Sequence, residues 1–162
     1  MNNSEIWLKA ILIEGDRLLV NNNENEKLMC GLFKTDRQIL WDNTQKRIIF
    51  EYTFSLVVNK AINWLKEMRK TDSSKKQEID EFLSHMPTAK EVRDMLEHDI
   101  DYLNNEGNKQ KRFVHNIKKK GLKIKLDTST PLILSDNYLI GGKLDVLKTI
   151  KKTEELLAKI GK

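Results

Sequence analysis

The chain has 162 residues, of which 39% are hydrophobic and 33% charged, and it contains one cysteine, Cys30. This length suits a single domain with a sizeable apolar core, and the composition suits a mainly helical protein in water. A single cysteine excludes an intramolecular disulfide and a multi-cysteine zinc site, and no apolar run reaches the roughly 18 residues of a membrane span. The N-terminal residues lack the pattern of a signal peptide, so we predict a cytoplasmic protein with no membrane partner.

The formal net charge of +5 is unevenly distributed along the chain. Residues 107–162 hold 14 Lys and Arg against 5 Asp and Glu, a balance of +9, whereas residues 1–106 hold 15 against 19, a balance of −4. Basic surfaces attract polyanions, of which nucleic acid is the commonest. The C-terminal third therefore indicates contact with nucleic acid, and the alternative is that its lysines are solvated surface.

Apolar residues recur at helical spacing through the first 70 residues. We expect a helix over 4–23 with Ser4 as its N-cap, a shorter helix over 24–33, and a long helix over 45–70. The long helix is apolar almost all round its middle, which is typical of the central helix of a bundle. The pattern does not assign a type to residues 34–43. Cys30 lies among Leu28, Met29 and Leu32, which predicts a core position.

The rest of the chain changes from helical to strand-like periodicity and back. A helix is predicted over 75–85, and a second over 89–104 begins with a capping box of Thr88 and Glu91. Residues 109–120 indicate a surface loop or short helix, 122–140 a small antiparallel β meander, and 144–160 an amphipathic helix. We therefore predict a mainly α fold. It is a single domain over 1–162, a helical bundle with a β insertion at about 121–142.

The helix predicted over 89–104 contains Arg93, Asp94 and His98. An arginine holds a phosphate in a fork of hydrogen bonds, and a histidine exchanges a proton near neutral pH. A base that takes the proton of a ribose 2′-hydroxyl, with a cation that stabilises charge on the phosphate, is the minimum for cleaving RNA without a metal. Asp94, four residues before His98, would orient the imidazole across one helical turn, and Tyr102 would add a hydroxyl on the same side.

An arginine, a polar residue, three further residues and a histidine, placed on a helix of a small bundle, resembles the motif of the HEPN superfamily. The resemblance covers about one helix and implies a metal-independent endoribonuclease without a cofactor, acting as a bacterial toxin or antiviral effector. It also implies a homodimer whose two motifs face a shared cleft, and a cognate antitoxin. Members often carry a tyrosine soon after the histidine; here Asp99-Ile100-Asp101 precedes Tyr102, a departure that leaves the role of Tyr102 open.

The spacing of Arg93 and His98 determines whether the two side chains can meet on one helix. Five residues at about 100° each place Arg93 and His98 roughly 140° apart around an ideal helix. They converge through the reach of the arginine, a local distortion or a second subunit, and the resemblance favours the second subunit. We expect the RNA backbone to be held by the basic residues Lys109, Lys111, Arg112, Lys118, Lys119 and Lys120.

Two other functions remain open. In the first, the protein is a non-catalytic helical module that binds nucleic acid or a partner protein, Arg93 pairs with Glu97, and His98 lies on an exposed face. In the second, His98-Asp99 and His85 are ligands of an HD-type metal phosphohydrolase. His85 is too close in sequence for the usual arrangement of ligands on separate helices, so this is the less favoured of the two. Three tryptophans are expected as core or interface anchors, namely Trp7, Trp41 and Trp64.

Overall fold

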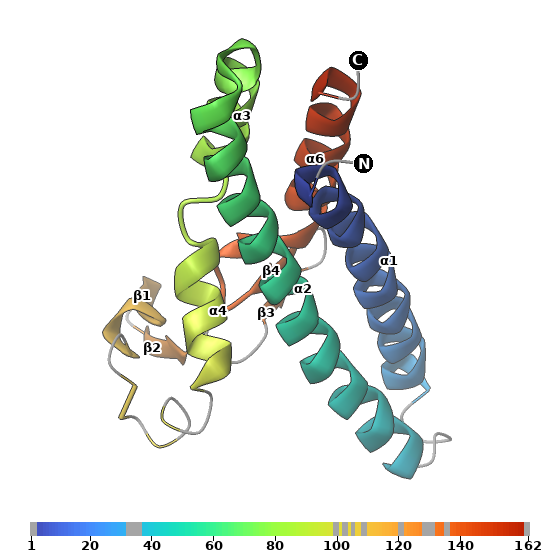
Figure 1. The fold of residues 1–162 in the computed structure, drawn as a ribbon. Coiled ribbons are helices and arrows are strands. Elements are labelled where there is room, and N and C mark those ends of the chain that lie inside the picture. Colours follow the sequence, from blue (N-terminus) through green and yellow to red (C-terminus); the bar gives the residue numbers. More distant parts are fainter. Residues whose placement is uncertain are drawn as a thin grey trace.

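The computed structural model describes residues 3–31, 37–98, 101, 104, 106–107, 110–119, 122–127, 132–134 and 137–160. For residues 29 and 110, and for the described residues from 115 to 137 inclusive, it describes the backbone alone. The fold is mainly α, with a small antiparallel β part before the C-terminal helix (Figure 1), so the predicted fold class is confirmed. No helix within the described ranges is long and apolar enough to cross a membrane.

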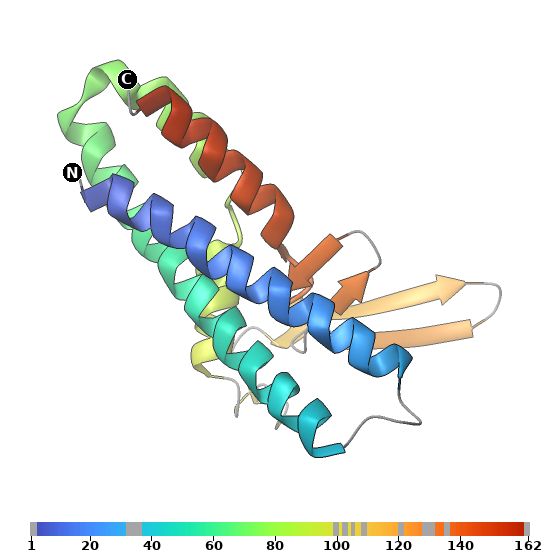
Figure 2. The same cartoon turned by 90° about the vertical axis from the view of Figure 1, so that its right-hand side faces the viewer.

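Two long helices form the frame of the molecule. Helix α1 (Asn3–Cys30, 28 residues) and helix α2 (Arg37–Thr71, 35 residues) run antiparallel and pack along their length (Figure 2). Their facing sides carry apolar residues at intervals of three, four and seven, which brings one face of each helix into the core. The core between them contains Leu8, Ile11, Leu18, Phe54, Val58 and Leu65, all 0% exposed.

The prediction of two helices over 4–33 is wrong, because α1 continues through the asparagine run. Asn21 and Asn25 are buried, and the Asn25 Nδ2 donates to the Asn21 Oδ1 at 3.4 Å. The Asn22 Nδ2 donates in the same way to Glu26 at 3.0 Å. Side-chain bonds four residues apart give the Asn22 and Asn25 amide nitrogens partners within the helix, so the run does not end it. Cys30, the last residue of α1, is exposed, which corrects its predicted core position.

Helix α2 also begins earlier than the predicted residue 45. The Gln38 Nε2 donates to Asp42 at 2.7 Å, and the Thr44 hydroxyl donates to the Leu40 carbonyl at 2.9 Å. Thr44 therefore lies inside the helix and does not cap its start. Residues 37–43 of the segment that the sequence left untyped are helical, and 34–36 lie outside the described residues.

Shorter helices cover the frame. A 3₁₀ turn η1 (Ser73–Lys75) leads into α3 (Lys76–Ser84), α4 (Ala89–Glu97) packs on α2, and α6 (Val146–Ile160) packs on α1 and α3. The capping box predicted before α4 is wrong, because the Thr88 side chain makes no cap hydrogen bond. Glu91 instead pairs with Lys143 at 3.1 Å and with Arg112 at 3.2 Å. Helix α4 ends at Glu97, well before the predicted residue 104.

The β part consists of two sheets. After a 3₁₀ turn η2 (Gln110–Arg112), β1 (Val114–Lys119) and β2 (Leu122–Asp127) pair as a hairpin that extends away from the helices (Figure 2). Strands β3 (Leu132–Leu134), β4 (Asn137–Ile140) and β5 (Leu144–Asp145) form an antiparallel sheet against α6. The loop or helix predicted over 109–120 is therefore wrong for 114–119, where pairing with β2 decides the conformation, and α6 begins two residues later than predicted.

A glycine turn closes this sheet beneath α4. Gly141 and Gly142 have φ angles of 59° and 65°, which favour glycine. A Cβ on Gly141 would lie 3.1 Å from the Met95 Cε and 3.2 Å from the Phe113 Cε1. Met95 and Phe113 are themselves buried, at 1% and 0% exposure. The inner face of α4 therefore rests on backbone where a side chain would be crowded and where the positive φ favours glycine.

Candidate functional site on helix α4

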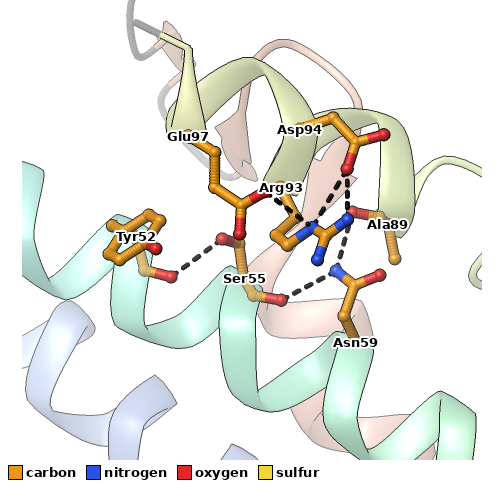
Figure 3. Close-up of polar contacts among 7 residues, drawn as sticks. All are labelled: Tyr52, Ser55, Asn59, Ala89, Arg93, Asp94 and Glu97. Atoms are coloured by element: carbon orange, nitrogen blue, oxygen red, sulfur yellow. Dashed lines mark hydrogen bonds and ion pairs between the residues drawn. The ribbon is translucent and has the colours of Figure 1, made fainter.

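Helix α4 is fixed on α2 through its first residue. Ala89, Val92 and Met95 recur every three residues and are buried on its inner face. The Asn59 Nδ2 on α2 donates to the Ala89 carbonyl at 3.0 Å and to the Ser55 carbonyl at 2.9 Å (Figure 3). Asn59 thus joins the two helices and sets where the next turn of α4 lies.

On that next turn, the Arg93 guanidinium is held by two carboxylates. Its Nε donates to the Asp94 Oδ1 at 3.0 Å, and its Nη2 donates to the same oxygen. The Glu97 Oε2 lies 3.5 Å from Nε (Figure 3). The hydrogen bond from Arg93 to Asp94 raises the pKa of Arg93 above its ordinary value, so the group stays a cation.

One edge of this guanidinium remains available. The bonds to Asp94 use Nε and Nη2, and Nη1 makes no hydrogen bond to any residue that the structure describes. The Arg93 side chain is 28% exposed. An arginine fixed along one edge by a carboxylate offers its other edge in a defined direction, which suits binding of an oxyanion.

His98 lies at the end of α4 and faces water. It follows the last helical residue with φ −121° and ψ 35°, and its backbone N–H donates to the Met95 carbonyl at 3.2 Å. Its side chain is 65% exposed, with Nδ1 3.6 Å from the Asp101 Oδ2. The predicted contact with Asp94 does not form in this arrangement, because His98 leaves the helical path and Asp94 binds Arg93.

Arg93 and His98 are therefore not brought together within one chain. Arg93 lies at the junction of α4 with α2, near Tyr52, whereas the partner of His98 among the described residues is Asp101. The ion pair between Arg93 and Glu97 and the exposed imidazole agree with the non-catalytic alternative stated above. Tyr102 and Asp99 lie outside the described residues.

The predicted basic residues lie on η2 and on the β1–β2 hairpin. Lys111 and Arg112 are exposed, and Arg112 pairs with Glu91 at 3.2 Å. Lys118 and Lys119 stand in register with Lys123 and Leu122 of β2. Lysines thus gather along both strands of the hairpin. Lys109 and Lys120 lie outside the described residues.

A buried acid that the sequence analysis missed joins α2 to the sheet. Glu51 is 1% exposed; the Tyr138 hydroxyl donates to its Oε1, and the Arg47 Nε lies 3.8 Å from that oxygen. Burial raises the pKa of Glu51 to about 7. Burial and the nearby Glu51 carboxylate also raise the pKa of Tyr138, which keeps its hydroxyl a donor. The available signal was the position of Glu51 on the face of α2 that carries Phe54 and Val58.

The described residues contain no group of three or more His, Cys, Asp or Glu side chains placed to hold a metal ion. Comparison of the chain with protein-family models, with curated proteins and with solved structures gives no match.

Proposed function

We propose that the protein is a metal-independent endoribonuclease of the HEPN type, acting in a bacterial toxin or antiviral defence system. The observation that carries this proposal is a guanidinium fixed by Asp94, with one edge available, on a short helix that ends directly before an exposed imidazole. Arg93 binds the scissile phosphate, and His98 is the general acid or base. The lysines of the β1–β2 hairpin hold the RNA backbone.

In this proposal the reaction is attack by the neighbouring ribose hydroxyl. His98 takes the proton of the 2′-hydroxyl, the oxygen attacks phosphorus, and the bond to the 5′-oxygen breaks. The leaving 5′-oxygen takes a proton from water, His98 gives its proton to the hydroxide that remains, and the products are a 2′,3′-cyclic phosphate and a 5′-hydroxyl. Arg93 stabilises the negative charge that develops on the phosphate oxygens.

The proposal requires two copies of the chain, because one copy keeps Arg93 and His98 apart. A surface on α2, here called the α2 stripe, supports such pairing. It consists of Trp41, Ile48, Ile49 and Tyr52, which are 61%, 41%, 60% and 37% exposed. At about 100° per residue these four fall within an arc of roughly 100°. The stripe reaches Tyr52, which lies near Arg93, so pairing through it brings the two motifs toward a shared cleft.

A second function is favoured by one specific observation. Asp94 and Glu97 accompany Arg93, and Asp101 accompanies His98, so negative charge surrounds both groups that would meet a phosphate. In this case the protein binds nucleic acid or a partner protein without cleaving it, and the basic hairpin provides the contact.

Cleavage of a labelled single-stranded RNA in the presence of EDTA tests the proposal. We expect cyclic-phosphate ends by mass spectrometry, and a loss of about 100-fold or more in rate for Arg93→Ala and for His98→Ala. His85→Ala, at the end of α3, is the matched control and should keep full activity. Circular dichroism verifies that each variant is folded, and induced expression in bacterial cells tests toxicity.

The outcomes separate the two functions. Wild-type protein that leaves RNA intact, or Arg93 and His98 variants that cleave it at the wild-type rate, would overturn the enzyme proposal. Salt-dependent RNA binding without cleavage, weakened when Lys118, Lys119 and Lys120 are replaced by alanine, supports the non-catalytic module.

A further inference from the structure

The two carboxylates on Arg93 are held very differently. Asp94 accepts two hydrogen bonds from the guanidinium. The Glu97 Oε2 lies 3.5 Å from Nε, beyond the usual length of a hydrogen bond, and the Glu97 side chain is 32% exposed. Partly exposed ion pairs of this kind contribute little to stability.

The position of Glu97 also makes its carboxylate easy to displace. Glu97 is the last residue of α4, where the helix dipole is negative and repels an acidic side chain. Its side chain has more rotatable bonds than that of Asp94, so it moves into water without moving the backbone. A phosphate, by contrast, forms two parallel charge-assisted bonds with a guanidinium.

We infer that Glu97 is an electrostatic competitor for Arg93: in the free protein it partly neutralises the guanidinium from the Nε side, and it moves into water when a phosphodiester binds along the edge that carries Nη1, while Asp94 stays in place. This inference rests on the proposed function, since it takes Arg93 as the phosphate-binding group. It gives the two acids opposite roles. Asp94 positions the guanidinium for its ligand, whereas the negative charge of Glu97 lowers the affinity for that ligand.

Binding of a 2′-O-methyl oligoribonucleotide tests this inference, because that RNA lacks the attacking hydroxyl and is not cleaved. Fluorescence anisotropy gives its Kd for the wild type, Glu97→Gln, Asp94→Asn, Arg93→Ala and the double variant of Glu97→Gln with Arg93→Ala. We expect Glu97→Gln to bind about two- to fivefold more tightly than the wild type. Asp94→Asn should bind more weakly, since the guanidinium loses its fixed direction.

Two comparisons exclude a general effect of charge. Asp101→Asn removes one negative charge from the same end of α4, beside His98, and should give a much smaller gain. In the Arg93→Ala background the gain from Glu97→Gln should vanish, because coupled residues give non-additive effects.

The Kd values distinguish failure of this inference from failure of the proposed function. If Arg93→Ala weakens binding but Glu97→Gln leaves the Kd unchanged, the competitor role is wrong and the phosphate site stands. An equal gain from Asp101→Asn, or a gain that persists without Arg93, also overturns the competitor role. If Arg93→Ala binds as well as the wild type, Arg93 is not a phosphate site, and both fail.

Discussion

Individual ionisable residues on α2 and α4 are placed in contrasting surroundings. Arg93 is partly exposed and keeps its charge beside Asp94, whereas Glu51 is buried and its pKa rises to about 7. The charged and titratable groups that face Glu51 among the described residues are Arg47 on α2 and Tyr138 on β4. Near neutral pH the folded protein therefore contains both protonated and charged forms of this acid.

The pKa of Glu51 predicts a pH dependence of stability. Its ordinary value is 4.5 and its folded value about 7, so the folded state holds the proton more strongly. The free energy of unfolding therefore falls as the pH rises from about 4.5 to about 7, by about 3 kcal/mol, and then levels off. Urea unfolding between pH 5 and 8 should show that Glu51→Gln lacks this decline. The exposed Glu154→Gln is the control, and a decline that persists in Glu51→Gln would refute the assignment.

Some of these residue contacts could be predicted from the sequence and others could not. The pairing of Arg93 with Glu97 follows from a spacing of four on a helix, and it was stated as an alternative. The contact of Arg93 with its neighbour Asp94 depends on the side-chain rotamers that α2 permits. The hydrophobic periodicity of the sequence does not predict these rotamers. Glu51 and Tyr138 are 87 positions apart, and only the packing of β4 on α2 brings them together.

Helices and strands differ in how far their own residues determine their conformation and their ends. The amphipathic patterns predicted α3 and α6 closely, because each buries one clear face. The C-terminal end of α1 and the start of α2 were predicted wrongly, since the asparagines of α1 and Thr44 of α2 bond within their helices, although these residue types favour helix ends elsewhere. Strand β1 has two apolar residues in six, so its conformation depends on β2 and not on its own pattern.

The crossing of α1 with its neighbours predicts the effect of a substitution at Gly15. A Cβ there would lie 2.6 Å from the Ile150 Cδ1 and 2.7 Å from its Cγ1. Alanine normally stabilises a helix relative to glycine by about 1 kcal/mol, but here we expect Gly15→Ala to destabilise the protein by about 1–3 kcal/mol. Urea unfolding measures the change.

A double-mutant cycle assigns that cost to the contact with Ile150. Ile150→Ala removes both crowded carbons, so the double variant should lose less stability than the sum of the two single variants. Additive losses, or a Gly15→Ala variant more stable than the wild type, would show that α1 and α6 adjust without strain.

At the scale of the whole molecule, charge is unevenly distributed along the chain. The first 106 residues carry a balance of −4, and they include the helix with Arg93 and His98. The remaining residues carry +9 and include the basic β hairpin. Under the proposed function, the basic hairpin would attract the RNA and the α4 site would cleave it.

The α2 stripe predicts the assembly of two chains. Ile49 is 60% exposed, so Ile49→Asp should leave the stability of the monomer nearly unchanged but shift a dimer toward monomers in sedimentation equilibrium. Ile13→Asp, which alters an isoleucine on α1 with 54% exposure, is the matched control and should leave the assembly intact. A wild type that is monomeric at tens of micromolar, or an equal effect of the control, would rule out pairing through this stripe.

The glycine turn under α4 affects how a genetic screen of this protein would be interpreted. Gly141 has a positive φ and lies against Met95, on the side of α4 opposite Arg93, so a larger residue there would strain the backbone and crowd the Met95 and Phe113 side chains. Under the proposed function, a selection for inactive alleles would recover changes at Gly141 together with changes at Arg93 and His98, although Gly141 contacts the inner face of α4. Temperature separates the two groups: alleles at Gly141 should recover activity in cells grown in the cold, whereas alleles at Arg93 and His98 should be inactive at every growth temperature.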